Sequence, residues 1–124
     1  MQKPCLLVYI NDLYFQSVIE EIVLAQNMDV YFAAQGEQLS QLAKTLAPFM
    51  MIIDLSGIDS EWLFGHIGSI RPMRPEFPMV ALVSQEQDEV RDRAEKYGVN
   101  RVLTKAEFVK KLPDVIEHFL LGSH

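Results

Sequence analysis

Residues 49–54 read Phe-Met-Met-Ile-Ile-Asp, and this stretch decides the fold. The five apolar residues from Phe49 to Ile53 are typical of a strand that is buried on both faces, as in a parallel sheet. Asp54 then places a carboxylate directly at the end of that strand. The stretch therefore predicts a buried sheet and one position on its edge where a polar side chain stands.

The rest of the chain alternates between two patterns of apolar residues. Short apolar runs predict four more strands, at residues 5–10, 29–33, 79–83 and 99–104. Apolar residues with helical spacing follow each strand: Phe15, Val18, Ile19, Ile22 and Val23; Leu39, Leu42, Ala43 and Leu46; Leu63, Ile67 and Ile70; Val90, Ala94 and Tyr97; Leu112, Val115, Ile116 and Phe119. This alternation predicts an α/β fold, a (βα)₅ doubly wound five-stranded parallel sheet with helices on both faces.

Proline and glycine residues predict where helices end. Pro72, Pro75 and Pro78 predict an extended connection before the strand at 79–83, because proline is poorly accommodated inside a helix. Pro113 either starts the last helix or kinks it after a short first turn. Gly98 stands where a left-handed residue would close the fourth helix.

Length and composition indicate one globular domain that spans residues 1–124. The chain has 124 residues, and roughly 150 residues are usual for a domain. Apolar residues make up 49% of the chain, which excludes a disordered segment. The net charge of −6 argues against direct binding to nucleic acid, whose phosphates attract basic surfaces. Cys5 is the only cysteine, so neither a cysteine-rich metal scaffold nor an internal disulfide can form.

No stretch of the sequence resembles a membrane or export segment. The apolar run at residues 5–10 is far shorter than the roughly 20 residues that a membrane-spanning helix needs. Asn11 and Asp12 follow it at once, so a signal-peptide cleavage pattern is missing. We therefore expect a cytoplasmic protein that does not contact membranes.

Polar side chains follow four of the five predicted strands. They are Asp12, Asp54, Ser84 and Lys105. The carboxyl ends of parallel strands lie on one edge of the sheet, which is where such folds bind ligands. Two aspartates offer oxygen ligands for Mg²⁺, and one of them, Asp54, can attack a phosphoryl group. A lysine and a hydroxyl can hold the phosphoryl oxygens.

In the order and spacing of these four residues, the whole chain resembles the receiver domains of bacterial two-component response regulators. The resemblance implies the flavodoxin-like, CheY-like three-layer sandwich. It also implies roles: Asp54 as phosphoacceptor, Asp12 as metal-binding acid, Ser84 as the hydroxyl that switches, and Lys105 as the family's lysine. The backbone carbonyl of Ser56 would be a further Mg²⁺ ligand, and Gln85 would face the phosphoryl group.

The same resemblance implies partners. A histidine kinase or a phosphotransfer protein would supply the phosphoryl group, and an unknown downstream protein would read the phosphorylated state. Receivers often pair weakly through their fourth and fifth helices, so a weak homodimer is also expected. Catalysis would be limited to self-phosphorylation and dephosphorylation at Asp54, without a metabolic reaction.

The sequence departs from the family pattern at several positions. Asn11 replaces the first of two acids, so it would reach the metal through water, and Mg²⁺ binding should be weak. Gly57-Ile58 replaces a Met-Pro turn, Val102 replaces an aromatic residue, and Ala106 replaces a cis-proline. These departures keep an alternative open, a pseudo-receiver that binds partners without being phosphorylated. Asp54 would then be a structural carboxylate paired with Lys105.

Overall fold

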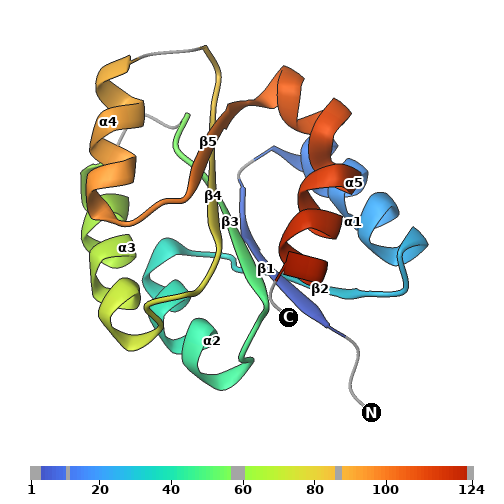
Figure 1. Cartoon of the computed structure of the whole chain (residues 1–124), viewed down its shortest axis with the longest axis horizontal. Coiled ribbons are helices and arrows are strands. Elements are labelled where there is room, and N and C mark those ends of the chain that lie inside the picture. Colours follow the sequence, from blue (N-terminus) through green and yellow to red (C-terminus); the bar gives the residue numbers. More distant parts are fainter. Residues whose placement is uncertain (1–3, 11, 57–60, 86–87, 123–124) are drawn as a thin grey trace.

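The computed structural model describes residues 4–10, 12–56, 61–85 and 88–122 (Figure 1). The strands are β1 (Cys5–Tyr9), β2 (Asp29–Phe32), β3 (Met50–Asp54), β4 (Met79–Val83) and β5 (Arg101–Thr104). The helices are α1 (Leu13–Ala25), α2 (Leu39–Thr45), α3 (Glu61–Met73), α4 (Asp88–Tyr97) and α5 (Lys105–Gly122), with a short 3₁₀ helix, η1, at Gly36–Gln38.

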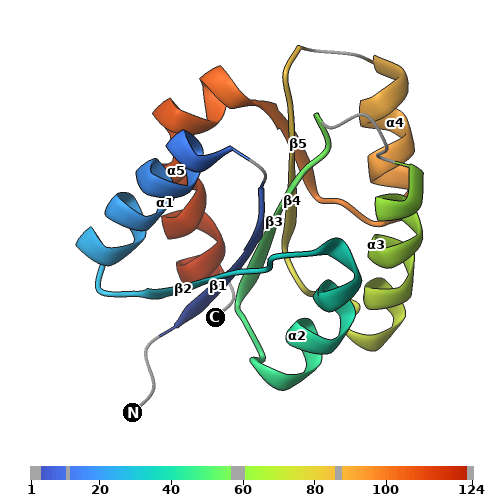
Figure 2. The ribbon, with the colours of Figure 1, turned by 180° about the vertical axis from the view of Figure 1, so that it is seen from behind.

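The five strands form one parallel sheet in the order β2-β1-β3-β4-β5. Helices α1 and α5 cover one face of this sheet, and α2, α3 and α4 cover the other, as Figures 1 and 2 show from opposite sides. β1 pairs with both β2 and β3, so the direction of winding reverses beside β1. The predicted doubly wound (βα)₅ sheet is confirmed.

The middle strands have no exposed face, which explains their continuous apolar sequence. Met50 and Ile52 pack toward the α1 and α5 side, together with the fully buried Phe108. Met51 and Ile53 pack toward the α2, α3 and α4 side. Alternate side chains of a strand point to opposite faces, so both faces of β3 need apolar residues. None of the described helices is long and apolar enough to cross a membrane.

The prediction for Pro72 was wrong, and one of the two alternatives for Pro113 is excluded. Pro72 lies inside the last turn of α3 instead of in an extended connection. Near a helix end the missing N–H removes only one backbone bond, and the buried Ile70 keeps this turn packed on the core. Pro113 lies well inside α5, which begins at Lys105, so it does not start that helix.

The last strand begins two residues later than predicted. Gly98 has the left-handed φ of 117° expected after α4, and the Val99 N–H bonds to the Ala94 carbonyl at 3.0 Å. This bond belongs to the closing turn of the helix, so Val99 does not join the ladder. β5 therefore starts at Arg101, which pairs with Val80.

Candidate functional site

The ends of β1, β3 and β5 bring three of the predicted residues to the same edge of the sheet. Asp54 is the last residue of β3 and is 4% exposed. Asp12 precedes the first residue of α1, and Lys105 is the first residue of α5, directly after β5. Asp12 and Lys105 are therefore fixed at the starts of helices, and Asp54 is fixed at the end of a strand.

One ammonium group joins the two carboxylates. Lys105 Nζ lies 3.2 Å from Asp54 Oδ2 and 3.8 Å from Asp12 Oδ2. The Lys105 side chain is 19% exposed, so water screens these pairs less than on an open surface. Its Nζ also lies 5.3 Å from the centre of the Phe15 ring, within the range of a cation–π contact. The sequence pattern did not single out Phe15 for this role.

The second oxygen of Asp54 is also occupied. Asp54 Oδ1 accepts hydrogen bonds from the Ser56 backbone N–H at 2.9 Å and from the Ser56 hydroxyl at 2.5 Å. The sequence reasoning assigned Ser56 only through its backbone carbonyl and missed the hydroxyl. With Lys105 at Oδ2, both oxygens of this carboxylate have fixed partners, so its orientation is set before any ligand binds.

Asp12 has a structural task as well as a place in the site. It adopts an extended conformation before α1, and its Oδ1 accepts from the N–H groups of Tyr14 at 3.0 Å and Phe15 at 3.3 Å. This is an N-cap, which satisfies backbone donors that have no partner inside the helix. An aspartate directly before a helical pattern is a signal for such a cap. Asp12 thus uses one oxygen for α1 and the other for Lys105.

A capping box fixes the turn that carries Lys105. The Thr104 N–H and hydroxyl donate to Glu107 Oε1 at 3.1 and 3.0 Å, and the Glu107 N–H donates back to the Thr104 hydroxyl at 3.1 Å. These backbone and side-chain hydrogen bonds from Thr104 lower the pKa of Glu107. The spacing of a threonine and a glutamate three residues later is readable in sequence, and it marks the start of a helix.

The other predicted residues lie further from this contact cluster or outside the described residues. Ser84 follows β4 with an exposed side chain, and the pairing of Val83 with Thr104 places it on the Lys105 edge of the sheet. Gln85, next to it, is also exposed. The predictions for Asn11 and for Gly57-Ile58 fall outside the described residues.

The donor set suits a hard cation. Asp12 and Asp54 both direct an oxygen at Lys105 Nζ, within 4 Å, so a positive charge already stands between them. Mg²⁺ binds through one or two protein carboxylates and keeps several waters. Among the described residues, no group of three or more histidine, cysteine, aspartate or glutamate side chains could hold a metal. Asp12 and Asp54 are therefore two carboxylates of the kind that Mg²⁺ accepts as ligands.

The fold is shared with proteins of known structure, although no protein-family model and no curated protein sequence matches the chain. A response regulator from Thermotoga maritima is 13% identical, with a TM-score of 0.81 over 94% of this chain and 97% of that one. The chemotaxis protein CheY4 of Vibrio cholerae is 14% identical, with a TM-score of 0.80 over 94% and 98%. The BeF3-activated DrrB receiver domain is 22% identical, with a TM-score of 0.78 over 97% and 98%. The chain therefore has the CheY-like fold of response-regulator receiver domains.

Proposed function

We propose that this chain is a receiver domain that accepts a phosphoryl group on Asp54 and signals through contacts with other proteins. One observation carries the proposal: the Lys105 ammonium lies within 4 Å of carboxylate oxygens of both Asp54 and Asp12. The three groups gather at the carboxyl edge of a parallel sheet, the usual place of ligand sites in this class of fold.

The transfer would proceed by attack of an Asp54 carboxylate oxygen on the phosphorus of a phosphohistidine. A P–O bond forms while the P–N bond breaks, and the electron pair of that bond returns to the imidazole of the donor. The attacking oxygen must first leave its present partner, Ser56 or Lys105. Lys105 then stabilises the charge on the phosphoryl oxygens. Bound Mg²⁺ would supply further positive charge at these oxygens, held by Asp12, Asp54, the Ser56 carbonyl and, through water, Asn11.

The readout would depend on the exposed end of β4. Ser84 is exposed and stands on the same edge of the sheet, so its hydroxyl would turn toward a new phosphoryl group, with Gln85 beside it. Val102, half-buried on β5, lacks the bulky ring that the family uses at this point. We therefore expect a smaller rearrangement on phosphorylation than in receivers that carry an aromatic residue there.

The proposed donor is a histidine kinase or a phosphotransfer protein. Leu13 and Tyr14 begin α1 directly after Asp12, and they are 78% and 69% exposed. Large apolar side chains at such exposure are candidates for a contact with another protein. A donor histidine that reaches Asp54 would pass close to this end of α1.

Incubation with acetyl phosphate and Mg²⁺, followed by intact-mass measurement, tests the proposal. One phosphoryl group adds about 80 Da. The Asp54→Asn variant should gain no mass. Asn11→Asp adds a carboxylate, so it should lower the Mg²⁺ concentration that the reaction needs. If neither the wild type nor Asn11→Asp gains mass at saturating donor and Mg²⁺, the phosphoacceptor proposal fails, and a binding module of the same fold becomes the better account.

A further inference from the structure

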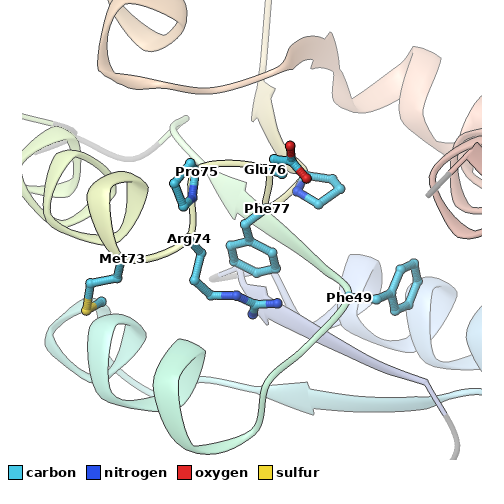
Figure 3. Close-up of a pocket in the computed structure, with 7 residues that line it drawn as sticks. Phe49, Met73, Arg74, Pro75, Glu76 and Phe77 are labelled. Atoms are coloured by element: carbon cyan, nitrogen blue, oxygen red, sulfur yellow. The ribbon is translucent and has the colours of Figure 1, made fainter. Parts of the chain in front are cut away.

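A pocket lies at the opposite edge of the sheet from Asp54, between the start of β3 and the loop that joins α3 to β4 (Figure 3). Phe49 and residues 73–78 line it, and we call it the Arg74 pocket. Its volume is about 600 Å³, within the range of sites that bind small molecules. It is far from the residues to which the proposed function assigns a role.

A second hollow adjoins the Arg74 pocket. It measures about 280 Å³, and its walls are Ala43, Lys44, Ala47, Met73 and Arg74. Met73 and Arg74 line both hollows, so these two side chains form their common wall. A ligand in the Arg74 pocket would therefore lie beside Arg74, and Lys44 lines the hollow on the other side of this wall.

The wall of the pocket is held by hydrogen bonds. The Phe77 N–H bonds to the Arg74 carbonyl at 3.1 Å and closes a turn that has Pro75 at its second position. Arg71 Nη1 donates to the carbonyls of Arg74 at 3.1 Å and Pro75 at 2.9 Å. A loop that is fixed in this way loses little conformational freedom when a ligand binds, so more of the contact energy appears as affinity.

The charge of the pocket favours an anion. The Arg74 guanidinium carbon lies 4.1 Å from the centre of the Phe77 ring, and Nη1 donates to the Ala43 carbonyl at 3.4 Å. A guanidinium has five N–H donors, so others remain for a ligand. Within the described part of the chain, neither Arg74 nor Lys44 has a carboxylate at ion-pair distance. Glu76 also lines the pocket, but in Figure 3 the Phe77 ring stands between its carboxylate and the guanidinium.

We propose that the Arg74 pocket binds a small aromatic anion, a flat apolar group that carries a carboxylate, sulfonate or phosphate. The flat group lies against Met73, whose side chain is 43% exposed, and against the exposed Pro75, and the anion takes hydrogen bonds from Arg74, with Lys44 in the adjoining hollow. This proposal does not depend on phosphorylation of Asp54.

A matched pair of fluorescent probes tests the proposal. 8-Anilinonaphthalene-1-sulfonate is a flat aromatic anion, and N-phenyl-1-naphthylamine is the same ring system without the sulfonate. The sulfonate probe should bind one site per chain at least about tenfold more tightly than the neutral probe, since charge-assisted hydrogen bonds are the stronger kind. Amide resonances of the non-proline residues in 43–49 and 73–79 should shift in the ¹H–¹⁵N spectrum of the folded protein.

Three variants locate the binding. Arg74→Gln should weaken the sulfonate probe about tenfold and Lys44→Gln about threefold, while Lys110→Gln, an exposed position on α5, should change nothing. Urea unfolding shows whether Arg74→Gln keeps its fold. If it does not, the affinity of Lys44→Gln for the sulfonate probe tests the proposal instead. Equal affinity for the two probes, resonance shifts confined to other parts of the chain, or wild-type binding by the folded variants would each overturn the proposal.

Discussion

The ammonium of Lys105 lies 3.2 Å from Oδ2 of Asp54, although the Asp54 side chain is only 4% exposed. A buried carboxylate without a cation is costly, so this pair holds the end of β3 to the start of α5. Asp12 faces the same ammonium at 3.8 Å. One cation therefore balances two carboxylates, and the charge of the whole site depends on Lys105.

Lys105→Met should destabilise the fold by about 2–3 kcal/mol, because Asp54 then stays buried without a cation and close to Asp12. In an Asp54→Asn background the same change should cost less than about 1 kcal/mol, since an amide needs no counter-charge. Urea unfolding of the four proteins gives the coupling between the two positions. Equal losses in both backgrounds would mean that Lys105 stabilises the fold through its other contacts, Asp12 and Phe15, instead.

Two substitutions at Asp12 separate the contribution of its helix cap to stability from the contribution of its charge to Mg²⁺ binding. Asn caps a helix about as well as Asp, so Asp12→Asn should change stability little, whereas Asp12→Ala should lose about 1 kcal/mol. Both variants should weaken Mg²⁺ binding, because both remove a carboxylate. Thermal unfolding measures the first effect, and the rise of Tm with Mg²⁺ concentration measures the second. If Asp12→Asn kept the wild-type response to Mg²⁺, its place among the metal ligands would be wrong.

Glu107 should make stability depend on pH in the acid range. Hydrogen bonds from Thr104 lower the pKa of the folded carboxyl below its usual value of 4.5, so its contribution is complete above that pH. The contribution falls as the pH drops through the folded pKa. Glu107→Gln keeps a cap acceptor and cannot titrate. The wild type should therefore be the more stable protein at pH 7, and this advantage should shrink as the pH falls below 4.5. A difference that stays constant across this range would contradict the prediction.

Sequence patterns predict features that depend on neighbouring residues better than contacts between residues that are far apart in the chain. The apolar run before Asp54 is local, and it placed both the strand and its carboxylate correctly. Thr104 and Glu107 are also local, and their spacing marks the start of α5. Arg71 is different, because its Nη2 donates to the Gly98 carbonyl 27 positions away at 2.5 Å. Periodicity carries no information about such a pair.

The two sites also differ in how much of them was predictable. Asp12, Asp54 and Lys105 follow strands, so sheet topology alone predicts that they meet. The Arg74 pocket depends on how one loop closes against residues before β3, and no motif reports this. The Ser56 hydroxyl bond to Asp54 arises from the turn after β3, whose shape the sequence pattern does not specify.

Gly98→Ala should destabilise the fold by about 1–3 kcal/mol, because the left-handed φ of 117° is strained for any other residue. An added Cβ would also lie 2.8 Å from Arg71 Nε, and hydrogen bonds hold that side chain in place. Gly65→Ala is the control. It lies inside α3 with nothing within 4 Å of an added Cβ, so it should stabilise the helix by about 0.5–1 kcal/mol. Chemical unfolding of both variants should give opposite signs, and a shared sign would refute the argument from backbone conformation.

Leu13→Ala should slow phosphoryl transfer from a protein donor and leave the reaction with acetyl phosphate unchanged. Leu13 is 78% exposed at the start of α1, beside Asp12, so a docked protein would cover it, whereas a small donor would not. The rate of transfer from the protein donor should fall about fivefold to tenfold, the usual effect of removing one well-placed apolar contact. Leu24→Ala, 55% exposed near the other end of α1, is the matched control and should transfer at the wild-type rate.

The measurement uses phosphorylated histidine phosphotransfer domains, screened first for transfer to the wild-type chain. Labelled phosphate is then followed from donor to receiver for the wild type, Leu13→Ala and Leu24→Ala. A selective loss in Leu13→Ala locates the donor over the first turn of α1, because the chemistry with acetyl phosphate reports that Asp54 and Lys105 are intact. A parallel loss with both donors would instead trace the defect to the site itself, through the Asp12 cap that begins the same helix.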